Sequence, residues 1–395
     1  MREDESMYSD MTALKCAIVR GGTSKGIFLM DNDLPADANS RKKVIQAVFG
    51  SPDNRQIDGL GGADTLTSKL AIIGPSKRED ADVEYTFAQV GIDRDIVDFG
   101  GNCGNISSGV GPFAIDAGLV KAVEPITTVR IYQTNTDRIL TAEVPVKDGK
   151  AQAEGNFHID GVPGTGAKIT MDFSSTVGSA TGKLLPTGNV IDYIEVNGKY
   201  YPVSIVDAGI PLVFIGAESL ELEGNESAAE IDADRNLLHL IEDIRSRAAV
   251  MIGLGKTPED VTKNSPYAPF FAIVNSPKSY VTPSGQVVEE DEVDLVSRLL
   301  FMQKMHKTYP GTGSVATAAA VRIPGSIPYN KLRRAADDHV IIHIGHPAGI
   351  MDVESVAHQK DGRTVIEKLA FYRTARKIMD GLVYIKNSVL GEIYG

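Results

Sequence analysis

The sequence predicts an α/β protein built from two similar halves. Its 395 residues exceed what one ordinary hydrophobic core accommodates, and the 42% of hydrophobic residues can fill two cores. Apolar strand patterns alternate with helical runs along the chain. The order of these elements starts again near residue 184, which indicates a weak internal repeat. Length, alternation and repetition together favour a first half over residues 1–184 and a second half over residues 185–377.

The first half is expected to begin with a strand hairpin and to contain two helices. The elements in order are strands within 14–30 around a glycine turn, a helix over 40–49, a Gly-rich loop from 55 that leads into a strand at 69–73, strands at 83–87 and 96–99, a helix directly after Cys103, and short strands over 128–157.

The second half is expected to repeat this order. Its elements are strands within 205–215, a long amphipathic helix over 229–251, a strand at 270–274, a second helix over 289–307, a glycine turn at 309–314 that opens a further helix, and a strand at 340–344. The chain closes with further strand pattern through 383–385. The helix over 289–307 is inferred from Val293, Val296 and Leu300, which would share one helical face.

The charge and the residue composition indicate which partners and cofactors the protein is expected to bind. A net charge of −12 argues against nucleic acid or an anionic membrane as the main partner. The first residues are acidic and no apolar stretch is long enough to span a bilayer, so the sequence predicts a cytoplasmic protein. Two cysteines are too few for a disulfide scaffold, and the seven histidines lack paired ligand spacing. We therefore expect no metal.

The stretch G-G-N-C-G-N-I-S-S-G-V-G places Cys103 where a helix begins. The free N–H groups and the positive dipole end of a first helical turn favour an anion or a thiolate there. The turn Y-P-G-T-G-S at 309–314 opens a second helix in the same way. Two such helix starts that face one cleft would bind a dicarboxylate or tricarboxylate. Lys69, at the edge of a Gly-rich loop, is the second acid/base candidate.

Three other motifs are weaker. G-T-S-K-G at 22–26 fits the serine nucleophile elbow, but a strand follows it where the elbow needs a helix. The same run lacks the residue order of a P-loop. G-T-G-S-V-A at 311–316 fits a loose dinucleotide fingerprint, which we reject because a helix is expected before it and no βαβ unit is evident.

Six blocks in one order resemble the PrpF family of isomerases over nearly the whole chain. They are R-G-G-T-S-K-G (20–26), R-Q-I-D-G-L-G-G-A-D-T-L-T-S-K (55–69), N-C-G-N-I-S-S-G-V-G-P-F-A (102–114), I-D-G-V-P-G-T (159–165), L-P-T-G-N (185–189) and R-T-A-R (373–376). The resemblance implies a diaminopimelate epimerase-like fold, with two halves that each curl a mixed or antiparallel sheet around a central helix. It also implies that the C-terminal tail, about 378–395, completes the first half.

The resemblance carries family roles to matching positions. Lys69 and Cys103 would be the catalytic acid/base pair, with the choice of base left open. The substrate-binding positions would be Thr23, Ser24, Gly104, Asn105, Ile106, Ser107, Gly311, Thr312, Gly313 and Ser314. Two-thiol epimerases of this fold carry a second cysteine where this chain has Pro310. A cysteine–cysteine racemase is therefore disfavoured.

The implied activity is a cofactor-independent isomerase that shifts a C=C bond in a small unsaturated dicarboxylate by 1,3 proton transfer, of the methylitaconate to dimethylmaleate type. Two alternatives within the family are cis–trans isomerisation of 2-methylaconitate and tautomerisation of 4-oxalomesaconate. An alternative of another class is a non-catalytic tricarboxylate-binding accessory protein, against which the presence of both Lys69 and Cys103 speaks. The family also allows for a homo-oligomer.

Overall fold

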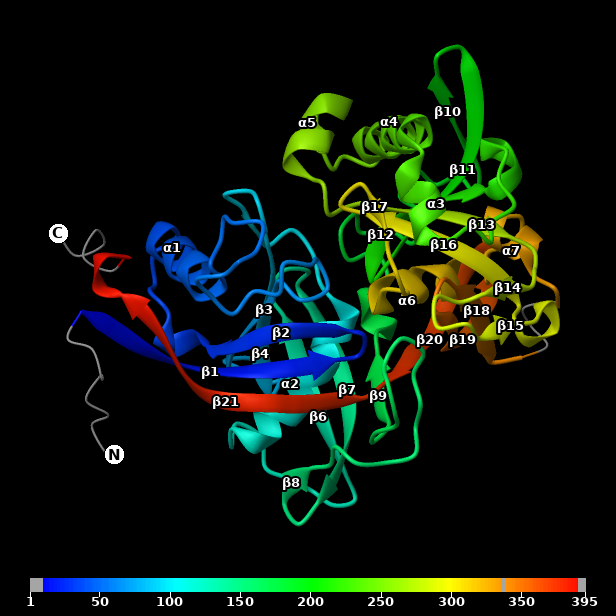
Figure 1. The fold of residues 1–395 in the computed structure, drawn as a ribbon. Helices are drawn as coiled ribbons and strands as arrows, with labels where there is room; N and C mark the ends of the chain where they lie inside the picture. Colours follow the sequence, from blue (N-terminus) through cyan, green and yellow to red (C-terminus); the bar gives the residue numbers. More distant parts are fainter. Residues whose placement is uncertain (1–9, 335–338, 390–395) are drawn as a thin grey trace.

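The computed structural model describes residues 10–334 and 339–389, and it shows two halves, each with a curled mixed sheet around a buried helix (Figure 1). The sheet of the first half contains β1 (Met11–Gly21), β2 (Ser24–Met30), β3 (Lys69–Pro75), β4 (Val83–Val90), β5 (Val97–Asp98), β6 (Ile126–Gln133), β7 (Arg138–Lys147), β8 (Lys150–Ala151) and β9 (Ile169–Asp172). Its helices are α1 (Ala38–Phe49) and α2 (Gly104–Asp116).

The second half contains the corresponding elements. Its strands are β10 (Asp192–Val196), β11 (Lys199–Ala208), β12 (Ile210–Gly216), β13 (Phe270–Asn275), β16 (Leu295–Phe301), β17 (Lys304–Met305), β18 (Ile341–His346), β19 (Gly349–Lys360) and β20 (Arg363–Arg373), and β14 (Tyr280–Val281) pairs with β15 (Val287–Val288) apart from the main sheet. Its helices are α3 (Ala228–Ala233), α4 (Arg235–Met251), α5 (Pro258–Asn264), α6 (Gly311–Ala320) and α7 (Ile327–Lys331).

Strand pairing follows the same scheme in both halves, so the internal repeat is structural. The parallel pairs β2–β3 and β4–β6 of the first half correspond to β12–β13 and β16–β18 of the second. Antiparallel pairs lie between them in the same places. The β9–β20 pair joins the two halves into one continuous sheet. The sequence-based boundary at residues 184 and 185 falls in the connection between β9 and β10 and stays a prediction.

The C-terminal strand returns to the first half. β21 (Ala375–Lys386) pairs antiparallel with β1 along its whole length, and Figure 1 shows this red strand beside the blue one. It therefore occupies the place beside β1 that β10 occupies beside β11. Residues 390–395 of the tail expected to complete this half lie outside the described residues.

Each sheet is covered by an inner and an outer helix. The inner helices α2 and α6 are buried almost all round because the curled sheets enclose them, and Val110 and Val315 are fully buried. The outer helices α1 and α4 bury one face only. Asp37 and Asp234 cap their first turns. Among the described residues, no helix is both long and apolar enough to cross a membrane.

Two sequence-based expectations for the second half are corrected. Residues expected to form a helix over 289–307 instead form a 3₁₀ turn and strands β16 and β17. Every residue of β16 is buried, including Ser297 and Arg298, so the strand shows no alternation of exposed and buried positions. The spacing of its apolar residues therefore resembles one face of a helix. The helix expected over 229–251 is divided into α3 and α4 at Asp234. A strand precedes the turn at 309–314, and β16 and β18 are parallel and connected through α6. Both reasons given for rejecting a dinucleotide fingerprint there are therefore wrong.

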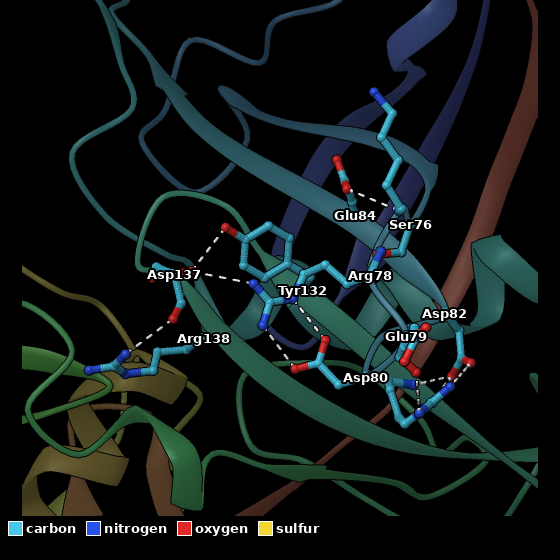
Figure 2. Close-up of polar contacts among 11 residues, drawn as sticks. Ser76, Arg78, Glu79, Asp80, Asp82, Glu84, Tyr132, Asp137 and Arg138 are labelled. Atoms are coloured by element: carbon cyan, nitrogen blue, oxygen red, sulfur yellow. Dashed lines mark hydrogen bonds and ion pairs between the residues drawn. The ribbon is translucent and has the colours of Figure 1, made fainter.

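An exposed polar cluster links the β3–β4 connection to the β6–β7 hairpin (Figure 2). Arg78 pairs with Asp80 and lies over the ring of Tyr132, whose hydroxyl donates to Asp137 at 3.0 Å. These groups are solvated, and exposed ion pairs of this kind contribute little to stability. The cluster therefore connects two surface loops, and we do not consider it a candidate catalytic site.

Candidate active site

The two central helices begin against each other, and neither start has a side-chain cap. Cys103 is the N-cap of α2 and Pro310 is the N-cap of α6. A Cβ added to Gly104 would lie 2.9 Å from both the Cα of Gly311 and the backbone N of Thr312. Only glycine permits backbones this close. The positive ends of two helix dipoles therefore meet at one buried point.

This junction gathers backbone N–H groups that have no intrahelical acceptor. They belong to the first three residues of each helix, which are Gly104, Asn105, Ile106, Gly311, Thr312 and Gly313. Ser107 and Ser314, which are also predicted to bind substrate, give their N–H groups to the carbonyls of Cys103 and Pro310. The hydroxyl of Ser107 lies within hydrogen-bond distance of the carbonyl of Cys103 and Oδ1 of Asn102, and that of Ser314 donates to the carbonyl of Gly311. The uncapped, buried donors at the junction form a site for an anion.

Lys69 and Cys103 meet beside this junction. Lys69 begins β3 and is 3% exposed, and its Nζ donates to Oε1 of Gln89 on the adjacent strand at 2.7 Å. The rings of Phe87 and Phe301 lie 5.4 and 5.6 Å from the same Nζ. Burial lowers the pKa of Lys69, while the charge of a Cys103 thiolate and a side-chain hydrogen bond with Cys103 oppose that shift. The amine therefore lies close to the thiol of Cys103.

Two of the predicted binding hydroxyls have no partner within the described structure. Oγ of Ser24 and Oγ1 of Thr312 are buried and make no hydrogen bond there, and the two residues are 2% and 1% exposed. A buried hydroxyl without a partner costs free energy. These two groups are therefore available to a bound molecule.

A chain of hydrogen bonds runs from Arg373 to His306. Nε of Arg373 donates to Oδ1 of Asn105 at 2.8 Å, which fixes the amide so that its Nδ2 donates to Oγ1 of Thr23. The hydroxyls of Thr23 and Thr308 are 3.0 Å apart, and that of Thr308 lies 3.2 Å from Nδ1 of His306. Because the backbone N–H of Thr308 also donates to this Nδ1, the ring must accept there. The proton of His306 is consequently on Nε2.

His306 and His346 are both buried as neutral imidazoles. Burial, with the positive charge of Lys69 as the next cause, lowers the pKa of His306 to about 3. Burial and the charge of Arg373 also lower the pKa of His346 well below its ordinary value. Nδ1 of His346 accepts from the backbone N–H of Ala348. Both rings can therefore donate from Nε2 without carrying charge.

We expect His306 to make the protein sensitive to acid. Its folded pKa of about 3 lies below the ordinary value of 6.5, so the unfolded chain binds its proton first as the pH falls. The stability from the neutral ring is complete above pH 6.5 and is lost progressively down to about pH 3. When the pH falls from 6.5 to 4, the unfolding free energy of His306→Gln should therefore decrease by about 3 kcal/mol less than that of wild type. Urea titrations at several pH values measure this difference.

His239 provides the matched control because it is exposed on α4. His239→Gln should follow the wild-type curve. An unchanged slope in His306→Gln would show that His306 is not the group that is protonated on unfolding.

The structure adds functional candidates that sequence analysis missed. They are Gln89, His306, Thr308, His346 and Arg373. The R-T-A-R block contains Arg373, but nothing in the sequence marks it as buried beside Asn105. His306 was hidden inside the supposed helix over 289–307, and Thr308 follows it directly. Within the described residues, no group of three or more His, Cys, Asp or Glu side chains is placed to hold a metal ion.

The architecture belongs to the epimerase-like fold class. A crystal structure of a hydroxyproline epimerase from Agrobacterium vitis is similar over 96% of this chain and 93% of that one, with a TM-score of 0.55 and 12% identity, which indicates a shared fold. The family model described as PrpF protein matches residues 11–386. The chain belongs to the PrpF family.

Curated relatives with isomerase or tautomerase names align over nearly the whole chain. It is 53% identical to the 3-methylitaconate isomerase of Eubacterium barkeri, over 97% of this chain and all of the relative. A crystal structure of methylitaconate-delta-isomerase, also 53% identical, has a TM-score of 0.81 and covers 97% of this chain and 98% of that one. The 4-oxalomesaconate tautomerase of Pseudomonas putida is 39% identical, and the 2-methyl-aconitate isomerase of Shewanella oneidensis 38% identical, each over 96% of this chain and 98% of the relative. The protein is an isomerase.

Proposed function

We propose that this isomerase shifts a double bond in a small unsaturated dicarboxylate by 1,3 proton transfer, with 3-methylitaconate as the preferred substrate. The observation that carries the proposal is the junction of two uncapped helix starts beside the Lys69–Cys103 pair. Anion binding and proton transfer are thereby combined in one buried place. The 53% identity to a 3-methylitaconate isomerase supports this choice among the unsaturated acids.

The first step requires removal of a proton from carbon next to a carboxylate. Such a proton is weakly acidic, and the carbanion forms only if its charge is stabilised as it spreads onto the carboxylate oxygens. The free N–H groups of Gly104, Asn105, Gly311 and Thr312 would hold these oxygens. The unpartnered hydroxyls of Ser24 and Thr312 would add donors.

The second step returns a proton at a different carbon. In the first step, one member of the Lys69–Cys103 pair has taken the proton from the carbon that carries the methyl group. The electron pair moves through the allylic system, the double bond shifts inward, and the terminal methylene carbon receives a proton and becomes a methyl group. Atoms and charge balance without an external oxidant or reductant. Burial of Lys69 supports this role because it lowers the amine pKa toward the range in which the amine exchanges protons.

The proposal predicts a specific labelling pattern in heavy water. The wild-type protein should convert 3-methylitaconate to dimethylmaleate, and the new methyl group should carry at most one deuterium per turnover. Proton NMR follows both the conversion and the label. Absence of turnover and of proton exchange with 3-methylitaconate would contradict the proposal.

The same experiment includes 2-methylaconitate and 4-oxalomesaconate, because relatives at 38% and 39% identity carry names for reactions of these acids. We expect 3-methylitaconate to give the highest kcat/KM. A higher value with either of the other acids would reassign the substrate while leaving the acid/base pair in place.

A further inference from the structure

Arg373 is a buried cation without a carboxylate partner among the described residues. It ends β20 and is 5% exposed. Nε of Arg373 donates to Oδ1 of Asn105, and Nη1 donates to the carbonyl of Tyr372 at 2.9 Å. Nη2 faces the sulfur of Met351 at 2.8 Å and lies 3.5 Å from the carbonyl of Tyr309. A thioether is a weak acceptor, so this end of the guanidinium is poorly matched.

Burying a guanidinium without a carboxylate partner lowers the stability of the protein unless an opposite charge pairs with it. Burial lowers the pKa of Arg373 to about 10, with no carboxylate to oppose the shift. The planar guanidinium fork matches a carboxylate in two parallel hydrogen bonds. The missing partner is therefore expected to be a carboxylate that the protein does not itself supply.

A cavity of about 80 Å³ lies beside this side chain. Its lining combines donors with a small apolar wall, and it includes Thr23, Thr308, Tyr309, His346, Met351 and Arg373. Two acidic residues also reach it, and both are already paired. Asp160 accepts from the backbone N–H of Ile350 at 2.6 Å, and Asp352 pairs with His343 at 2.7 Å.

Asn105 connects this cavity to the helix junction. It is the second residue of α2, so its backbone N–H belongs to the junction, while its side chain accepts from Arg373. Asn105 thus contributes to both anion-binding places, its backbone to the helix junction and its side chain to the cavity. That arrangement suits a short diacid whose carboxylates sit on neighbouring carbons.

We propose that Arg373 holds the second carboxylate of the substrate in this cavity while the paired starts of α2 and α6 hold the first. This inference rests on the proposed function, because it assigns the second charge of the same dicarboxylate. It makes Arg373 the residue that selects diacids over monoacids.

The test compares two probes that cannot shift a double bond, 2,3-dimethylsuccinate and its monoamide. Isothermal titration should show wild type binding the diacid about 10- to 100-fold more tightly than the monoamide. In Arg373→Gln this ratio should fall to about threefold or less, and Arg373→Lys, which keeps the charge but loses the fork, should fall between them. A residue that acts only in packing would weaken both probes equally and leave the ratio unchanged.

Arg376 provides the matched control, because it belongs to the same R-T-A-R block but is exposed. Arg376→Gln should keep the wild-type ratio. If Arg373→Gln does not fold, Arg373→Lys decides. A wild-type ratio in the folded Arg373 variant overturns the inference while the isomerase assignment stands. An Arg373-dependent ratio in a protein that isomerises none of the acids would overturn the proposed reaction and retain this site.

Discussion

Replacing Lys69 with alanine is expected to lower kcat/KM for isomerisation by about 10²- to 10⁴-fold, the usual contribution of a general acid or base. Lys69→Arg should be equally impaired, because a guanidinium remains protonated and cannot exchange the proton. Cys103→Ser should show a loss of the same order, since a hydroxyl ionises far less readily than a thiol. Coupled NMR and steady-state assays on folded variants measure these effects.

Two controls accompany these variants. Cys16 is the other cysteine and lies in the core under α1, so Cys16→Ala should keep the wild-type kcat/KM. Lys15 is exposed on β1, and Lys15→Ala should do the same. Full turnover in both Lys69→Ala and Cys103→Ser would remove the acid/base roles from this pair.

Adding one methyl group at the helix junction is expected to impair the enzyme more than it impairs the fold. In Gly104→Ala the new Cβ would sit 2.9 Å from backbone atoms of Gly311 and Thr312, which cannot rotate away as a side chain would. The two helix starts must then separate. A displacement of the binding groups by a fraction of an ångström to 1 Å should lower kcat/KM by about 10²-fold. The cost in unfolding free energy should be about 1 to 3 kcal/mol.

Gly74→Ala is the control for this prediction. Gly74 lies in β3, and its added Cβ would meet only the Cβ of Asp31 at 3.5 Å, an ordinary contact. Thermal unfolding and kcat/KM should be measured on both variants. Wild-type turnover in Gly104→Ala would mean that close contact between the helix starts is not needed to bind the substrate.

Sequence reasoning succeeded where function depends on residues close together in the chain. Cys103 lies in a glycine-rich turn at a helix start, and the structure places it as the N-cap of α2. The corresponding turn at Gly311 opens α6. Helix starts are encoded by a few adjacent residues, so their positions can be predicted locally. The order of strands and central helices follows from the same kind of pattern.

It failed where burial removes the periodic signal. Val293, Val296 and Leu300 have helical spacing, yet Val296 and Leu300 lie in β16, a strand that is buried on both faces, and Val293 lies just before it. A fully buried strand and a buried helix cannot be told apart by periodicity. This error also hid His306, because a histidine within a supposed packing helix has no expected partner.

The sequence by itself predicted the α/β fold and the two helix starts, and it pointed to Lys69 and Cys103 as the candidate acid/base pair. Only the tertiary structure decided that those helix starts touch, that Gln89 orients Lys69, and that Arg373 lies beside Asn105 although 268 positions separate them along the chain. The physical reason is the separation of the interacting residues along the chain. Caps and turns form from neighbouring residues, so the sequence shows them directly. The partners of a buried charge come from distant segments, and here they depend on how the β9–β20 pair and the strand order bring the two halves together.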